Sequence, residues 1–214
     1  MASIDRLRPH IRISLVAVEI DQATISDVGL FIYDFASLYE LGRLATDPYY
    51  EYFQFSRFAL YRNGRHLRSQ DQMNIDKLRL ESPMEVISTI AIVGGAAVAV
   101  AGAIWTITQT FEKIYNLPLN RRKLELEVQK LEREELAENR KNDSVISPDE
   151  AMRFLEERGA SPYIDVISRR LIKAPIRAES LDVELIDPRR EMDAQTLDDL
   201  KRSLKLKNLR KSEF

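Results

Sequence analysis

The residue types that most often perform catalysis or bind metals are scarce in this sequence. It contains no cysteine, which excludes disulfides, thiolate metal sites and cysteine nucleophiles, and it has only two histidines. His66 follows Arg65 in a basic stretch, but no second metal ligand or nucleophile accompanies it. The abundant carboxylates show no spacing that marks a general acid–base pair. We therefore expect no catalytic residue, no metal site and no enzymatic activity.

Nucleotide-binding and hydrolase motifs are absent as well. The sequence has no G-x-x-x-x-G-K-[ST] loop, no G-x-S-x-G motif and no H-E-x-x-H motif. Gly94 and Gly95 lie inside an apolar run without a following lysine, unlike a phosphate-binding loop. We expect no cofactor. The near balance of 32 basic and 34 acidic residues argues against nucleic acid as a partner, because nucleic-acid-binding domains carry a basic excess.

The most distinctive element is a run without any charge over residues 86–111. A helix that spans a membrane needs about 20 apolar residues. Residues 82–85 form a capping box with proline at the first helical position. We therefore predict a transmembrane helix over residues 83–112. Its interface with the membrane would include two aromatic and three basic residues: Trp105, Tyr115, Arg121, Arg122 and Lys123.

Small residues recur at helical spacing in this run. Small side chains four residues apart let two helix backbones approach closely, which is how spanning helices associate. The expected helix-packing interface consists of Ala91, Gly94, Gly95, Ala99, Gly102 and Ala103. The run lacks leucine, and alanine and glycine favour insertion only weakly. Weak insertion of a single helix together with a surface suited to close helix packing predicts a homo-oligomer.

Two alternatives remain open for the apolar run. A helix that is apolar on all sides also occurs in the interior of proteins, here between the subunits of a soluble oligomer. The Gly94–Gly95 pair also leaves room for a break in the middle of the run. Basic residues are nearly balanced on its two flanks, so they do not orient a spanning helix.

The N-terminal part, residues 1–82, is predicted to be a small α+β domain. Residues 11–20 alternate and are β-branched, as in a strand. A helix should follow from an N-cap at Ser26 or Asp27 to about Ala45, ended by Asp47–Pro48. A short strand is expected near Leu78. The aromatic residues between positions 49 and 61 are interpreted as core rather than as a ligand platform.

The rest of the chain is predicted to be a charged helix with a short coiled coil over residues 113–146, then a helical module with a strand over residues 147–214. That module should contain helices that begin at Ser147 and Ser161, a strand over residues 181–186 and a basic tail. If this strand pairs with the strand at residues 11–20, both flanks of the apolar run lie on one side of any membrane. A single span would then be impossible.

Together these features predict an α+β protein that is anchored in a membrane and forms oligomers. It would act as a pore-forming or membrane-perturbing effector, or as a non-enzymatic scaffold. The expected partners are the lipid bilayer, further copies of the chain and a protein bound by the N- or C-terminal module. The expected location is the plasma membrane, with most of the chain in the cytoplasm.

Overall fold

The computed structural model describes residues 10–19, 22–57, 67–81, 83–91, 97–117, 126, 129 and 147–186. Helices and a single antiparallel sheet make up these residues, which confirms the predicted α+β class. The elements in chain order are β1 (His10–Glu19), α1 (Ile25–Thr46), η2 (Pro48–Tyr50), η3 (Phe55–Arg57), η4 (Ser69–Asp71), β2 (Asn74–Arg79), β3 (Met84–Ala91), α2 (Ala97–Tyr115), α4 (Pro148–Glu157), α5 (Ser161–Lys173) and β4 (Ile176–Ile186).

The sheet joins strands from the two ends of the described chain. Its order is β2-β3-β1-β4, and each neighbouring pair is antiparallel. At the centre, Ile13 of β1 lies opposite Ser88 of β3 on one side and Val183 of β4 on the other. The strand pairing that would exclude a single membrane span is therefore present. The segments on both sides of the apolar run belong to one sheet.

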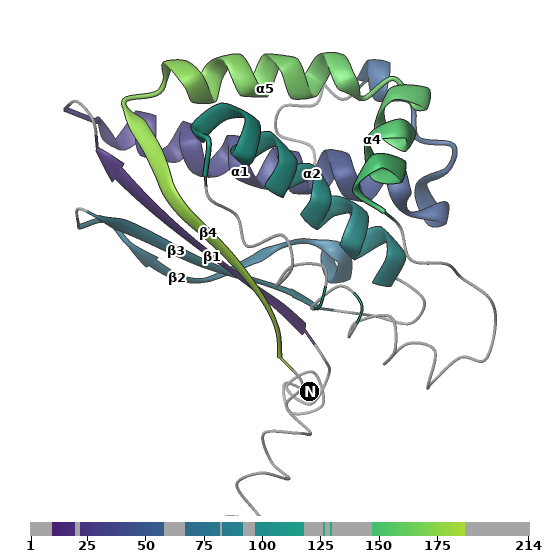
Figure 1. Ribbon diagram of the computed structural model, residues 1–214, viewed down its shortest axis with the longest axis horizontal. Coiled ribbons are helices and arrows are strands. Elements are labelled where there is room, and N and C mark those ends of the chain that lie inside the picture. The colour runs from purple at the N-terminus through teal and green to yellow at the C-terminus, as the bar shows by residue number, and fades with distance from the viewer. Residues whose placement is uncertain are drawn as a thin grey trace, which may run out of the picture.

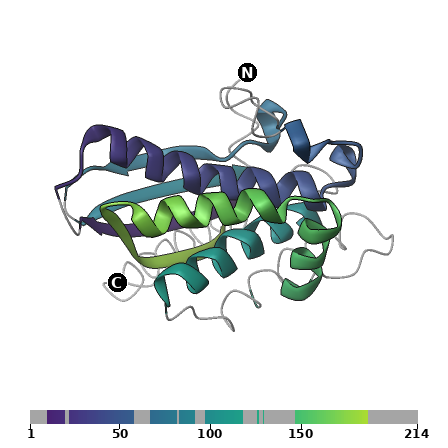
Figure 2. The same cartoon turned by 90° about the horizontal axis from the view of Figure 1, so that it is seen from above.

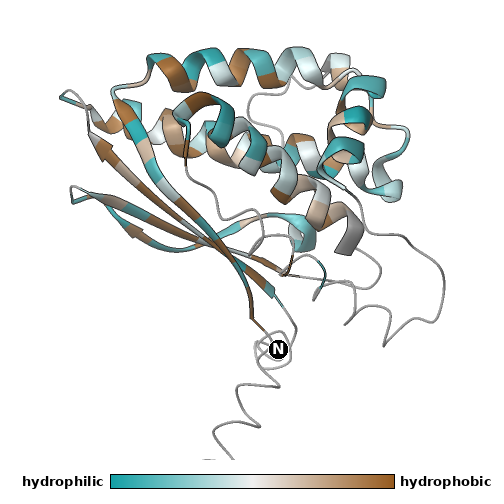
Figure 3. Cartoon of the chain, viewed as in Figure 1, coloured by the Kyte–Doolittle hydropathy of each residue, from teal (hydrophilic) through white to brown (hydrophobic). Residues whose placement is uncertain are grey.

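The helices cover one face of this sheet, as Figures 1 and 2 show from two directions. Because successive side chains of a strand point to opposite faces, only alternate residues reach the helices. Figure 3 shows apolar and polar residues alternating along the strands. In β1 the buried residues are Ile11, Ile13, Leu15 and Ala17, each at most 3% exposed.

The ends of α1 follow from local sequence chemistry. Thr24 is the N-cap, and its hydroxyl accepts a hydrogen bond from the Asp27 amide while the Asp27 carboxylate accepts from the Thr24 amide. The helix thus begins slightly before the predicted cap at Ser26. It ends at Thr46, because Asp47 and Pro48 begin the next turn, as predicted.

The apolar run is not one helix, and this prediction is wrong. Its first part is strand β3, in which burial alternates: Met84, Val86, Ser88 and Ile90 are buried, and the residues between them are half-buried. Helix α2 begins only at Ala97. The predicted capping box at residues 82–85 therefore does not start a helix. Four of the five residues 86–90 are β-branched and favour a strand, since their side chains pack well on a pleated surface.

Within the described ranges, no helix combines the length and apolarity that crossing a membrane requires. The transmembrane helix predicted over residues 83–112 is therefore corrected to a strand and a shorter helix that packs inside the protein. Helix α2 is buried against α1 of its own chain, which explains its apolar surface without lipid. The expectation of a lipid partner and a membrane location loses this support.

The C-terminal helices begin at the residues that the sequence predicts. Ser147 and Glu150 form a capping box at the start of α4, and Gly159, with φ of 70°, follows its end. Helix α5 begins at Ser161, and β4 includes the expected strand. In the region of the predicted charged helix beyond residue 117, only Leu126 and Gln129 are described before Ser147, and both are helical. The basic tail lies outside the described residues.

Candidate functional site

Three of the six small residues predicted as a helix-packing interface, Ala99, Gly102 and Ala103, lie at the contact between α2 and α1. A Cβ atom on Gly102 would lie 2.5 Å from Thr46 Cγ2, and one on Gly42 of α1 would lie 2.6 Å from Ala103 Cα. The Thr46 hydroxyl donates to the carbonyl oxygens of Gly42, at 2.8 Å, and Ala99, at 3.1 Å. Small residues therefore bring two helices of the same chain together.

The remaining predicted site residues are dispersed. Ala91 ends strand β3, and Gly94, Gly95, Arg121, Arg122 and Lys123 lie outside the described residues. Trp105 and Tyr115, expected at a membrane interface, are instead buried in the core, at 4% and 7% exposed. The Tyr115 hydroxyl donates to the Leu171 carbonyl at 3.3 Å. It thus attaches α2 to α5.

A cluster of polar residues surrounds the buried carboxylate of Asp71 at the end of η4. Its Oδ1 accepts a hydrogen bond from Arg43 at 3.2 Å, and its Oδ2 accepts from the Tyr50 hydroxyl at 2.7 Å and from Arg68 at 2.5 Å. The Tyr39 hydroxyl donates to the Asp71 carbonyl at 2.8 Å. The cluster joins the C-terminal half of α1 to the segment that precedes β2.

The electrostatics of this cluster favour a fixed negative charge. Burial by itself raises the pKa of Asp71, but the hydrogen bonds from Arg68 and Tyr50 and the charges of Arg43 and Arg68 outweigh it, so the pKa lies below its usual value. Both oxygens are occupied by donors, and Arg43 is only 1% exposed. A carboxylate held in this way stabilises the fold and does not transfer protons near neutral pH.

Two further arginine contacts attach α4 and α5 to the rest of the fold. The Arg158 guanidinium, at the end of α4, donates to the Tyr50 carbonyl at 2.6 Å. On α1, the buried Asp34 accepts two hydrogen bonds from Arg170 of α5, one of them from Nε at 3.1 Å. Both arginines are therefore bound within the chain, and each connects two elements of the fold.

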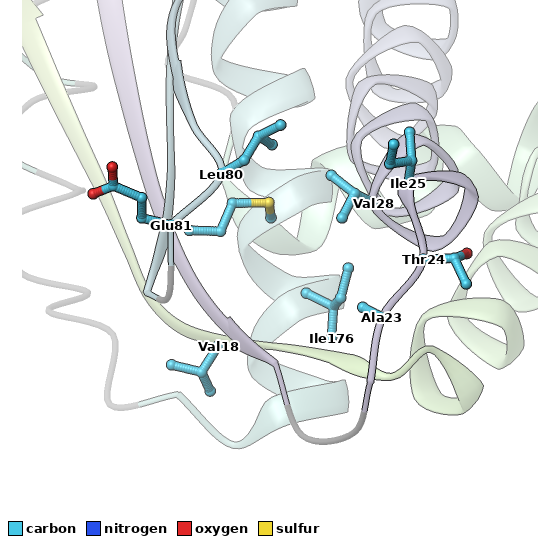
Figure 4. Close-up of a pocket in the computed structure, with 9 residues that line it drawn as sticks. Val18, Ala23, Thr24, Ile25, Val28, Leu80, Glu81 and Ile176 are labelled. Carbon is cyan, nitrogen blue, oxygen red and sulfur yellow. The ribbon is translucent and has the colours of Figure 1, made fainter.

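An apolar pocket of about 220 Å³ opens at the N-terminal end of α1. Figure 4 shows the side chains of Ala23, Val28 and Ile176 turned toward its centre, whereas the carboxylate of Glu81 and the hydroxyl of Thr24 point away. The Thr24 hydroxyl is already used in the helix cap. Because its walls are mostly apolar and the polar side chains of Thr24 and Glu81 point away, the pocket suits an aliphatic group rather than a reacting substrate.

Next to this pocket, the helix-facing side of β2 is poorly covered. Ile75 and Leu78 lie opposite the buried Ser88 and Val86 of β3, so they share the helix-facing side of the sheet. They are nevertheless 48% and 43% exposed, and Leu80, which also lines the pocket, is 63% exposed. We call these three residues the β2 stripe. The sequence of residues 74–80 does not predict this stripe, because a bulge after Ile75 disturbs the alternation of apolar and polar residues.

A second hollow lies between α2 and the start of α4, lined by residues that include Trp105, Glu112 and Asp149. The Trp105 indole nitrogen is buried and has no hydrogen-bond partner among the described residues. Residues 118–146 connect the two walls, and only two of them are described. Within the described part of the chain, no three potential metal ligands gather.

Comparison of the sequence with protein families and with curated proteins, and of the fold with solved structures, found no match. Within the part of the chain that the structure describes, the β2 stripe beside the apolar pocket remains exposed.

Proposed function

We propose that this protein is a non-enzymatic assembly domain that binds another polypeptide along strand β2. The observation that supports this proposal is the combination of an open edge with an exposed apolar stripe. Among the described strands, β2 pairs only with β3, and the helix-facing residues Ile75 and Leu78 remain nearly half exposed.

The backbone of an edge strand supplies the binding energy for such a partner. Alternate residues of β2 direct their N–H and C=O groups away from β3, where an added strand can pair with them. Edge strands with apolar side chains are avoided in proteins that remain alone, because they recruit other chains. An added strand would cover the β2 stripe and complete the helix-facing layer.

The apolar surface continues from β2 to the start of α1. Leu80 lines the pocket together with Ile25, which is 90% exposed. A partner that pairs with β2 can therefore place an aliphatic side chain in the pocket of about 220 Å³. Apolar contacts of this kind, next to backbone pairing, distinguish one partner from another.

The polar groups support a binding role over a catalytic one. The carboxylates of Asp34 and Asp71 are buried and bound by arginines of the same chain. Neither one lines the pocket, whose inward-pointing side chains are apolar. The pocket and the charged clusters therefore do not combine into a site for acid–base or nucleophilic chemistry.

The proposal is tested by site-specific photo-crosslinking of the full chain in the cells that express it. A photoreactive benzoylphenylalanine replaces Leu78 in one protein and Ile172, which is 63% exposed on α5, in the matched control. We expect a polypeptide adduct from position 78 that is lost when Ile75→Asp is added, and little adduct from position 172. Absence of an adduct at position 78, or equal adducts at both positions, would overturn the proposal.

A further inference from the structure

We propose that the partner of β2 is a second copy of this chain, whose β2 pairs antiparallel with it about a twofold axis. This inference rests on the proposed function and names the partner of the same edge. The register we infer places Ile75 opposite Leu78 of the other copy, and Asn74 opposite Arg79. It follows from the position of the bulge in β2 and from the order of residues 74–80.

The bulge places two consecutive residues on the outer face of the sheet. Ile75 is paired with Ser88 and Lys77 with Ile87, so Asp76 is the additional residue. The Asp76 carboxylate accepts a hydrogen bond from the Thr89 hydroxyl at 2.7 Å, and the Lys77 ammonium lies 2.7 Å from the Glu85 carboxylate. Thr89 and Glu85 both occupy outer-face positions of β3. Asp76 and Lys77 therefore together occupy one outward-facing position, or step, in the alternation of β2.

This single step makes the strand symmetric about its centre. On either side of the Asp76–Lys77 step, the helix-facing residues are Ile75 and Leu78, and the outer residues are Asn74 and Arg79. When two such strands run antiparallel with these steps face to face, apolar residues meet apolar residues on the helix side. On the outer face, Asp76 meets Lys77 of the second copy, and the reverse.

A twofold axis between the two copies of β2 is possible only because of the bulge. In an antiparallel pair related by a twofold axis, one position of the strand must lie opposite itself. In an unbulged strand, residues 75 and 78 would point to opposite faces and could not be opposed. The bulge removes this conflict, because it shifts residues 77–79 by one step relative to residues 74 and 75.

The charged pair also disfavours other pairings. A lysine at a strand edge opposes association with an arbitrary strand, because its charge would be placed against apolar or basic residues. In the inferred register each Lys77 faces an Asp76. A slip by one residue would instead direct the β2 stripe to the outer face of the partner's sheet. The edge is therefore selective for its own copy.

The absence of cysteine from the chain permits a sharp test of the register. Two full-length variants are made, Asn74→Cys and Arg79→Cys, each at an exposed position. Opposed residues of antiparallel strands have Cα atoms about 4.5–5.5 Å apart, within the range of about 4.4–6.8 Å that a disulfide spans. Under mild oxidation we expect a disulfide-linked dimer from the mixture of the two variants and very little from either variant alone.

The single variants are the matched controls, because in this register position 74 of one copy lies about four strand steps, or about 13 Å, from position 74 of the other. A mixture of Asn74→Cys with Lys77→Cys reports a slipped register and should remain monomeric in the denaturing gel. Equal crosslinking in all mixtures, or none in the first mixture, overturns the inferred register.

Charge reversal supplies a second measurement that does not depend on oxidation. In sedimentation experiments the purified wild-type chain should form a dimer as its concentration rises. Asp76→Lys and Lys77→Asp should each weaken self-association at least tenfold, because like charges then face each other. Their mixture should form heterodimers, since every opposed pair is again of opposite sign. Failure of the mixture to associate overturns the proposal.

These experiments test the identity of the partner and the proposed function separately. If the purified chain stays monomeric but position 78 still forms adducts with a different protein in cells, the second copy is not the partner while the assembly role stands. If position 78 forms no adduct in cells and the purified chain is monomeric, both proposals fail. Circular dichroism of every variant confirms that the chain is folded.

Discussion

Gly42 of α1 lies so close to Ala103 of α2 that a Cβ atom on Gly42 would be 2.6 Å from the Ala103 Cα atom. One turn further along α1, Thr46 makes the reciprocal contact with Gly102. Both contacts involve backbone or short side chains, so neither has room to yield. The small residues thus permit a close helix crossing inside the chain, and they position α1 and α2 over the sheet.

This contact predicts opposite effects for two alanine substitutions in the same helix. Gly42→Ala should lower the free energy of unfolding by about 2 kcal/mol or more, because the added methyl group meets backbone that must shift. Gly29→Ala, where no atom lies within 4 Å, should raise it by about 0.5–1 kcal/mol through higher helix propensity. Chemical denaturation measures both values. Equal stability of the two variants would contradict the close approach.

The Asp71 cluster predicts a dependence of stability on acid. The pKa of Asp71 in the folded protein lies below its value of about 3.9 in the unfolded chain. The Asp71 charge therefore stabilises the folded protein fully above about pH 4, and this stabilisation is lost as the pH falls through the lower pKa of the folded protein. Asp71→Asn should lower the free energy of unfolding by about 2–4 kcal/mol at pH 7, because the buried Arg43 loses its ion pair with Asp71. The difference from wild type should shrink below about pH 4.

Asp165→Asn is the control for this measurement, because Asp165 is exposed on α5. Its unfolding curves should match those of the wild type within about 0.5 kcal/mol at both pH values. A loss of stability in Asp71→Asn that does not change between pH 7 and pH 3 would show that the charge of Asp71 is unimportant.

Glu40 on α1 predicts the opposite dependence on pH. Burial raises the pKa of its carboxyl to about 7. Since this folded value lies above the unfolded value of about 4.3, ionisation favours the unfolded chain, and stability should fall as the pH rises from about 4 to 7. Glu40→Gln should therefore unfold like wild type at pH 4 and be up to about 3 kcal/mol more stable at pH 8.

The exposed Glu156 on α4 provides the matched substitution for Glu40. Glu156→Gln should leave the pH profile of thermal unfolding unchanged. If Glu40→Gln has the same profile as this control, the carboxyl of Glu40 is ionised in the folded protein at neutral pH.

The self-complementary order of β2 depends on the tertiary structure and not on the local sequence. Residues 74–80 show neither clean alternation nor helical spacing, and the sequence predicts a strand only near Leu78. The pairing with β3 reveals the bulge, and the exposed fractions of Ile75 and Leu78 reveal that no helix covers them. Both facts depend on neighbours distant in the sequence, which a local pattern does not contain.

The sequence by itself determined the elements whose ends carry local signals. Capping residues at Ser147, the break at Asp47–Pro48 and the alternation of residues 11–19 each act within a few neighbouring residues, so they predict α4, the end of α1 and β1. The α+β class follows from the same signals.

Only the tertiary structure decided what the apolar run becomes. Residues 86–111 carry no charge and are mostly apolar, so no periodicity separates the strand part from the helix part. Ile87 faces outward in β3 because β1 and the helices bury its neighbours Val86 and Ser88. In α2, Gly102 is enclosed because Thr46 of α1 lies against it. Burial on all sides can be supplied by lipid or by protein, and in this chain β1, β4 and α1 supply it.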